Sequence, residues 1–313
     1  MIGQGSQLQV LALVGPTGVG KSAAAVELAR LRNPQAVAIL NADAMQMYRG
    51  MDIGTAKASA PMRDQVPHHL LDLWDVNHRA SVVEFRDAAR GILRQLGEHT
   101  LPVMVGGSGL YLTATLDDLQ VPATDPVVRA RYEARLAEQG PQALHAELAR
   151  RDPLAAAGIA PANGRRIVRA LEVVELTGSF GSRLPRDVPA WMPTRWIGLV
   201  APTDQLDRVI GQRVAEMWAG GLIDEVAGLA ERGLRVGPTA SKAIGYAECL
   251  AFLDGQLSRT EAIQATALRT RQLARRQLRW FRRDPRIMWL SVDLTGATVD
   301  IATRIQESLA SPA

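Results

Sequence analysis

The sequence predicts an α/β protein with a parallel sheet at its core and a mainly helical insertion. Two observations predict this fold class. In the N-terminal third, short apolar runs typical of buried strands alternate with segments of helical spacing, which is the pattern of a parallel α/β sheet. From about residue 120 the chain becomes rich in Ala, Arg and Glu with helical spacing, which indicates a separate helical insertion.

The elements of the expected core follow these patterns in order. Before the insertion we expect strands over 8–14, 36–40 and 102–105. Helices are expected between them, over 22–32 and 82–96. After it we expect a strand over 194–200, helices over 204–220, 222–232, 242–254 and 259–282, and a short strand over 287–292. The core is therefore predicted to comprise residues 1–120 and 188–313.

The insertion is predicted to cover residues 121–187. Turn signals at Gly140-Pro141, Asp152-Pro153 and 161–164 divide it into several helices. A Gly- and Pro-rich segment, 178–193, predicts a loop leading back to the core.

Length and composition exclude several classes of protein. A chain of 313 residues with 47% apolar content can bury a sizeable core. No apolar stretch approaches the roughly 20 residues needed to span a bilayer, and the run 8–14 leads into a glycine loop as a strand does, which a signal peptide does not. Cys249 is the only cysteine, which excludes an intramolecular disulfide. We expect a cytoplasmic monomer without membrane attachment.

The segment between the first strand and the first helix matches the P-loop pattern G-x-x-x-x-G-K-[ST]. Its residues are Gly15, Pro16, Thr17, Gly18, Val19, Gly20, Lys21 and Ser22. Such glycines let backbone N–H groups converge on phosphate oxygens, and the helix N-terminus adds partial positive charge. We expect Lys21 to reach the outer phosphate and the Ser22 hydroxyl to ligate Mg²⁺. The core is thus predicted to be P-loop NTPase-like, binding ATP or another phosphate-bearing substrate; the alternative is a chance glycine-rich turn.

Two turns at strand ends are candidates for the rest of the site. Asp43 follows the second strand at the carboxyl edge, where ligands bind in open α/β sheets, and it is a candidate general base or magnesium partner. Its alternative role is an Asx turn or a helix cap. The strand 102–105 runs into Gly106-Gly-Ser108-Gly109 instead of an acidic Walker-B residue. This turn either brings backbone and hydroxyl donors to a ligand or is a plain connection.

Basic residues gather in two clusters. Between Arg269 and Arg286 there are eight arginines and one acid, with Trp280 and Phe281 among them. The spacing of Arg165, Arg166 and Arg169 puts them on one helical side. Arginine tracks neutralise nucleic-acid phosphates and interleaved aromatics stack on unpaired bases, although a solvated amphipathic helix has a similar pattern. The only lysines among the 36 basic residues, Lys21, Lys57 and Lys242, all fall in motif-like segments.

Several blocks after the P-loop together resemble the tRNA dimethylallyltransferase family, the tRNA isopentenyltransferases. The blocks begin at Asn41-Ala-Asp43-Ala-Met-Gln46-Met-Tyr48 and continue through Pro67-His-His-Leu-Leu-Asp72, Val105-Gly-Gly-Ser-Gly-Leu-Tyr111, Asp125-Pro126 with Arg129, Gly164-Arg-Arg-Ile-Val-Arg-Ala-Leu-Glu172, Ala243-Ile-Gly-Tyr246 and Thr270-Arg-Gln-Leu-Ala-Arg-Arg-Gln-Leu-Arg-Trp280. The resemblance covers about residues 8–292.

The resemblance implies transfer of a dimethylallyl group from its diphosphate to N6 of the adenine 3′ of the anticodon in certain tRNAs. It implies that the P-loop cradles the diphosphate, so that no Walker-B residue is needed, and that Mg²⁺ is the cofactor. Asp43 matches the general base, Lys21 and Arg213 match groups that act on the diphosphate, and Ser108 matches a further catalytic position with a hydrogen-bonding role. Ser108 takes a place that is often threonine in the family, which keeps the hydroxyl and loses a methyl group.

The resemblance also implies a surface for the anticodon stem-loop, gripped by the helical insertion. The candidate tRNA contacts are Asp43, Ala44, Met45, Gln46, Arg129, Arg165, Arg166, Ile167, Val168, Arg169, Lys242, Gly245 and Tyr246. Met47 and Tyr48 are weaker candidates for holding a base that is turned out of the loop. His68 and His69 match the family pattern, but we expect a structural role because no metal-ligand spacing accompanies them.

Three other functions remain open from the residues alone. A P-loop small-molecule kinase would turn over ATP without tRNA, but it gives no reason for the basic C-terminal helix. A prenyltransferase acting on free adenine nucleotides would not need the arginine clusters. A non-catalytic RNA-binding module would not need a P-loop with Lys21 and Ser22 intact.

Overall fold

The fold comes from a computed structural model that describes residues 9–180 and 188–310. Contacts divide the chain into two compact units. We call Met1–Asp117 with Ala190–Ala313 the sheet unit, and Asp118–Pro189 the helical unit. These limits lie close to the expected limits of core and insertion. Part of the predicted loop 178–193, residues 181–187, lies outside the described residues.

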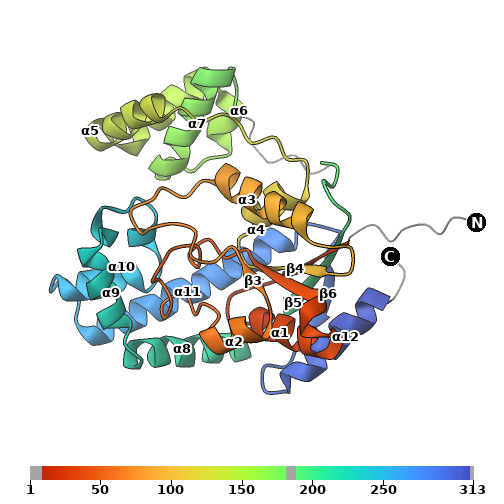
Figure 1. Cartoon of the computed structure of the whole chain (residues 1–313). Helices are drawn as coiled ribbons and strands as arrows, with labels where there is room; N and C mark the ends of the chain where they lie inside the picture. The colour runs from red at the N-terminus through yellow and green to blue at the C-terminus, as the bar shows by residue number, and fades with distance from the viewer. Residues whose placement is uncertain (1–8, 181–187, 311–313) are drawn as a thin grey trace, which may run out of the picture. The chain divides into compact units, whose positions relative to one another are not determined.

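The sheet unit is built on one parallel sheet, as predicted (Figure 1). Its six strands lie in the order β3-β2-β4-β1-β5-β6. The strands are β1 Val10–Val14, β2 Val37–Asn41, β3 His68–His69, β4 Leu101–Gly106, β5 Thr194–Val200 and β6 Met288–Ser291. The P-loop strand β1 pairs with β4 on one side and β5 on the other, so it lies at the centre of the sheet.

Helices cover both faces of this sheet because its strands are apolar on both faces. Leu11 and Leu13 belong to one core cluster, whereas Val10 and Ala12 belong to the other. The first cluster includes side chains from α1 Lys21–Arg32, α8 Thr203–Ala219, α9 Leu222–Glu231, α10 Tyr246–Leu253, α11 Arg259–Phe281 and α12 Thr298–Ala310. The second includes α3 Val82–Gln95 and α4 Gly109–Leu116, which Figure 1 shows on the opposite side from α1 and α12.

Local signals predicted most elements, with a few exceptions. The expected helix 242–254 is divided into a 3₁₀ turn, Ala240–Lys242, and α10, because Gly245 has a φ of 91° and interrupts the helix. The short helix α2 Ala60–Gln65, the two-residue strand β3, and helices α4 and α12 were not predicted. Helix α4 begins at Gly109, within the glycine-rich turn that follows β4. Because glycine is typical of turns, the sequence pattern did not indicate that a helix begins there.

The helical unit contains α5 Pro126–Arg151, α6 Pro153–Ala157 and α7 Gly164–Thr177. The predicted break at Gly140-Pro141 is a kink inside α5, where Gly140 has φ 77° and ψ 168°. The unit has its own hydrophobic core, which includes Tyr132, Leu144 and Leu171. In the described part of the chain, no helix is both long and apolar enough to cross a bilayer.

Candidate active site

The P-loop has the conformation that its glycines allow. Gly15, Gly18 and Gly20 have φ values of 143°, 85° and 89°, a region that other residues rarely adopt. A Cβ on Gly15 would also lie 2.5 Å from the carbonyl oxygen of Leu199 on β5, and one on Gly18 would lie 3.2 Å from Ile210 on α8. The loop is therefore held between β5 and α8, with Lys21 and the exposed Ser22 in the first turn of α1.

Lys21 lies within electrostatic reach of Asp43 and Arg213. Its ammonium donates to the carbonyl oxygen of Pro16 at 2.8 Å. Burial lowers the pKa of Lys21 to about 8, the Asp43 carboxylate counters part of that shift, and the Arg213 guanidinium adds to it. The structure thus brings together three of the four predicted catalytic residues, from α1, the end of β2 and α8.

Asp43 is fixed by a turn that begins at Asn41. The buried Asn41 amide accepts from the Asp43 N–H at 2.9 Å and donates to the Asp43 carbonyl at 3.0 Å. One carboxylate oxygen of Asp43 accepts the Met45 N–H at 3.0 Å. The other has no hydrogen-bond partner among residues 9–180 and 188–310. Asp43 therefore does form the Asx turn that was its alternative role. Its second carboxylate oxygen is still available to act as a base.

Ser108 joins the turns after β2 and β4. Its hydroxyl oxygen accepts the Ala44 N–H at 3.2 Å, and its own N–H donates to the Ala42 carbonyl at 3.3 Å. A Cβ on Gly106 would lie 2.2 Å from that carbonyl oxygen, so only glycine permits this approach. The fourth predicted catalytic residue therefore lies beside the Asp43 turn.

Arg213 is a partly buried cation in α8, three residues beyond the Ile210 side chain that contacts Gly18. Burial lowers the pKa of its guanidinium, while Asp43 and Glu216 act in the opposite direction. Within the described parts of the chain it forms no ion pair or hydrogen bond. Its charge is therefore available to an anion near Lys21.

Several of the predicted tRNA contacts have buried side chains. Ile167 and Val168 are 0% and 3% exposed, in the core of the helical unit. Tyr246 is 0% exposed and donates its hydroxyl to Glu225 at 2.5 Å, and Gly245 beside it is buried. The weaker candidates Met47 and Tyr48 are also fully buried, and Phe281 belongs to the core. These side chains pack inside the fold, and a role of these positions in tRNA binding stays a prediction.

The other candidates differ in how free their polar groups are. Ala44, Met45 and Gln46 are partly exposed beside Asp43, and the Gln46 amide donates to the Thr55 carbonyl at 3.1 Å. Lys242 is exposed. His68 and His69 form β3, where burial lowers the pKa of both imidazoles, and the described residues contain no cluster of His, Cys, Asp or Glu suited to a metal ion.

In the helical unit, Glu172 determines which arginines are free. This fully buried carboxylate accepts from Arg129 at 2.5 Å and from Arg169 at 2.8 Å. Arg169 also donates to the Pro122 carbonyl at 2.8 Å, which fastens the start of the unit. Arg165 and Arg166 are exposed and have no acidic partner in the described parts of the chain.

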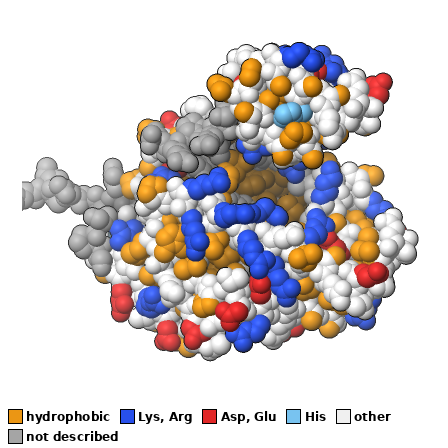
Figure 2. Space-filling view, turned by 180° about the vertical axis from the view of Figure 1, so that it is seen from behind, with side chains coloured by type: hydrophobic (Ala, Val, Ile, Leu, Met, Phe, Trp, Pro, Cys, Tyr) orange, Lys and Arg blue, Asp and Glu red, His pale blue; other side chains and the backbone are white. Residues whose placement is uncertain are grey.

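The C-terminal arginine cluster divides in the same way. Arg269 pairs with Glu248, Arg271 and Arg275 with Asp207, and Arg286 with Asp117 and Asp284. The remaining arginines are exposed and have no acidic partner among the residues described: Arg276, Arg279, Arg282 and Arg283. Trp280 is 39% exposed between them. Figure 2 shows Lys and Arg side chains gathered on one face of the sheet unit.

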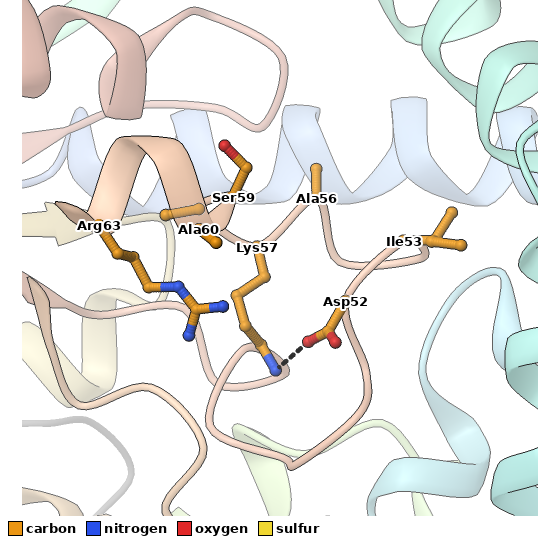
Figure 3. Close-up of a pocket in the computed structure, with 8 residues that line it drawn as sticks. Asp52, Ile53, Ala56, Lys57, Ser59, Ala60 and Arg63 are labelled. Carbon is orange, nitrogen blue, oxygen red and sulfur yellow. Dashed lines mark ion pairs between the residues drawn. The ribbon is translucent and has the colours of Figure 1, made fainter. Parts of the chain in front are cut away.

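A cavity of about 400 Å³ lies between residues 52 and 63 (Figure 3). The third lysine, Lys57, lines it, but its side chain is only 1% exposed. Its ammonium is bonded to Asp52 at 2.6 Å, Asp72 at 2.7 Å and the Tyr48 carbonyl at 2.8 Å. All three ammonium donors are therefore used to hold the segment that follows Asp43, and the cavity contains no free lysine.

Two site residues were missed by sequence reasoning. Asn41 holds the Asp43 turn and lies in the block Asn41–Tyr48 that resembles the family. Its position at the end of a strand could have indicated this role. Gln277 on α11 accepts the Thr17 N–H of the P-loop at 2.8 Å. No local pattern could indicate that interaction, because the two residues are 260 positions apart.

The whole chain is similar to proteins of one known family. A family model described as IPP transferase matches residues 46–284. A tRNA dimethylallyltransferase from Thermobifida fusca is 55% identical over 91% of this chain and 90% of its own. The crystal structure of a tRNA isopentenylpyrophosphate transferase from Bacillus halodurans is 39% identical, with a TM-score of 0.68 over 97% of both chains.

A second solved structure supports the fold alone. It is described as a eukaryotic dimethylallyltransferase acting on tRNA, and it is 24% identical with a TM-score of 0.77 over 96% of this chain and 79% of its own. The fold class predicted from the sequence is thereby confirmed. Because the family model covers most of the sequence and the Thermobifida relative matches nearly end to end, this chain belongs to the IPP transferase family.

Proposed function

We propose that this chain transfers a dimethylallyl group from dimethylallyl diphosphate to N6 of the adenine at position 37, 3′ of the anticodon, in certain tRNAs. The observation that supports it most is the joint placement of Asp43, Lys21 and Arg213. A carboxylate with one free oxygen lies within electrostatic reach of two cations, beside a P-loop. Cations suit a diphosphate, and a free carboxylate oxygen suits the proton of an attacking amine.

The proposed chemistry forms one bond and breaks one. The N6 lone pair attacks the allylic carbon that carries the diphosphate, and the bond from that carbon to the diphosphate oxygen breaks with its electron pair. The free oxygen of Asp43 takes the proton that N6 loses. Charge grows on the departing diphosphate, where the P-loop N–H groups, Lys21 and Arg213 stabilise it. The Ser108 hydroxyl keeps its proton available for donation while accepting from Ala44.

Mg²⁺ is the proposed cofactor. It usually binds through one or two protein groups together with substrate phosphates, and it neutralises charge on a leaving diphosphate when bound. The residues present fit that mode, because Ser22 is exposed in the first turn of α1 and its hydroxyl would hold the ion beside the P-loop. Lys21 and the Ser22 hydroxyl would then act on the same diphosphate.

The proposed tRNA contacts are, within each unit taken separately, the exposed arginines of the two predicted clusters that have no acidic partner among the described residues. These are Arg165 and Arg166 in the helical unit, and Arg276, Arg279, Arg282 and Arg283 in the sheet unit. Exposed Trp280 offers a face for an unpaired base. We propose that the protein acts as a monomer in the cytoplasm.

The test uses labelled dimethylallyl diphosphate, Mg²⁺ and two tRNA transcripts that differ only in having adenine or guanine 3′ of the anticodon. We expect label in the adenine transcript alone. AMP and ATP serve as competing acceptors. Label in AMP but not in tRNA would instead favour the prenyltransferase of free nucleotides. Phosphate release from ATP without any transfer would favour a kinase.

A further inference from the structure

The side chain of Gln277 lies between the two glycine turns of the site. Its amide oxygen accepts the Thr17 N–H of the P-loop at 2.8 Å. On its other side, a Cβ built on Gly107 would lie 2.1 Å from the amide nitrogen and 2.8 Å from the amide carbon. Gly107 therefore leaves the space that this side chain fills. One residue of the arginine-rich helix α11 thus reaches both turns.

The bond to Thr17 fixes a peptide group that also contacts Lys21. The Thr17 N–H and the Pro16 carbonyl belong to the same planar peptide, so their orientations are coupled. The Pro16 carbonyl accepts from the Lys21 ammonium at 2.8 Å. Rotation of this peptide would therefore move the acceptor of Lys21 as well as the donor held by Gln277. Gln277 and Lys21 hold the peptide from opposite ends.

We propose that Gln277 is a positioning residue that acts through the Pro16–Thr17 peptide to hold the P-loop and Lys21 ready for a diphosphate. The inference rests on the proposed function only for the identity of that ligand. Gln277 does not have to touch the ligand for this role. Its amide nitrogen has no hydrogen-bond partner in the described parts of the chain, so the acceptor oxygen is the atom that matters.

Gln277→Met tests the hydrogen bond separately from packing. Methionine keeps a side chain of similar length against Gly107 and removes the acceptor. The matched control is Gln272→Met on the same helix, where the glutamine is exposed. Calorimetry with inorganic diphosphate and Mg²⁺ measures binding, and steady-state kinetics give a KM for each substrate. We expect Gln277→Met to weaken diphosphate binding about three- to tenfold, the factor that one net hydrogen bond represents.

The kinetic pattern distinguishes positioning from general loss of structure. We expect the KM for dimethylallyl diphosphate to rise as diphosphate binding weakens, while the KM for tRNA and the melting temperature stay near wild type. Equal rises in both KM values, an effect as large in Gln272→Met, or wild-type diphosphate binding in Gln277→Met would overturn the inference. A wild-type protein that binds diphosphate and transfers nothing would contradict the proposed function alone.

Gly107 supplies an independent test of the same arrangement. Gly107→Ala places a methyl group in the space of the Gln277 amide, and all three nearest atoms belong to that side chain. We expect Gly107→Ala to weaken diphosphate binding as Gln277→Met does. In the Gly107→Ala, Gln277→Ala double variant the space is vacated, so the effects should be non-additive and the double variant no worse than Gln277→Ala. Strictly additive effects would overturn the inference.

Discussion

The Ser108 hydroxyl oxygen accepts the Ala44 N–H at 3.2 Å, and this bond joins the ends of β4 and β2 beside Asp43. A threonine side chain would keep the oxygen in that role, and an alanine would remove it. Comparing these two substitutions therefore tests whether the hydroxyl is the functional group at this position.

Ser108→Ala is expected to lower kcat by about 10²-fold, the order found when one preorganised donor to developing negative charge is removed. Ser108→Thr should keep most of the activity because the hydroxyl remains. Single-turnover transfer to tRNA measures both variants. Equal losses of rate in the two variants would show that side-chain size, not the hydroxyl, determines the rate.

Activity is expected to depend on the protonation of Lys21. Its pKa is lowered to about 8, so the ammonium is charged below that pH and becomes neutral above it. A neutral lysine attracts a diphosphate less, so kcat/KM for dimethylallyl diphosphate should fall as the pH rises through about 8. The comparison is Lys21→Arg, whose guanidinium stays charged. If the fall near pH 8 persists in Lys21→Arg, another group titrates there.

Arginines without acidic partners should account for the salt dependence of tRNA binding. Arg276→Gln with Arg279→Gln should reduce the slope of log K against log salt by about 0.7–0.9 for each tRNA phosphate that is no longer neutralised. The matched control is Arg271→Gln with Arg275→Gln, which removes the same charge from α11 at two arginines that both pair with Asp207. Filter binding at about 50 to 200 mM salt measures the slope. A larger change in the control pair would contradict this division of the cluster.

Tyr246 is expected to contribute to stability and not to tRNA binding. Burial, with Glu225 adding to its effect, raises the pKa of the Tyr246 phenol, which therefore stays protonated and donates to that carboxylate. Tyr246→Phe should lower the free energy of unfolding by about 1–3 kcal/mol, as expected for a buried hydrogen bond to a charged group. Urea unfolding measures it, alongside tRNA affinity. A lower affinity of Tyr246→Phe for tRNA with an unchanged free energy of unfolding would contradict this prediction and indicate that Tyr246 contacts the tRNA.

Most of the core could be predicted because its signals are local. Five apolar residues before Gly15, and the glycines themselves, specify a strand, a turn and a helix without reference to the rest of the chain. Asp43 could be predicted for a similar reason, since the carboxyl end of a parallel strand is where ligands bind. The family model and the relatives place the chain in the expected family, whereas the roles of individual residues remain predictions.

What could not be predicted depends on which way a side chain faces and on distant partners. Ile167 and Val168 stand between arginines in the sequence, yet the helix turns them into the core. The buried Glu172 forms ion pairs with Arg129 and Arg169. A count of arginines in the sequence therefore overestimates how many are free to bind phosphate. The hydrogen bond between Gln277 and Thr17 depends on how α11 returns to the P-loop, which no short segment specifies.

The most direct test compares single-turnover transfer to tRNA by the wild-type protein and Asp43→Asn, with binding of dimethylallyl diphosphate measured in parallel. Asparagine keeps an oxygen for the Met45 N–H and cannot take the proton from N6. We predict transfer by the wild type, a rate reduced by about 10²- to 10⁴-fold in Asp43→Asn, and retained diphosphate binding in both. Wild-type transfer rates in Asp43→Asn, or no transfer by the wild type, would contradict the proposed division of roles between Asp43 and the P-loop.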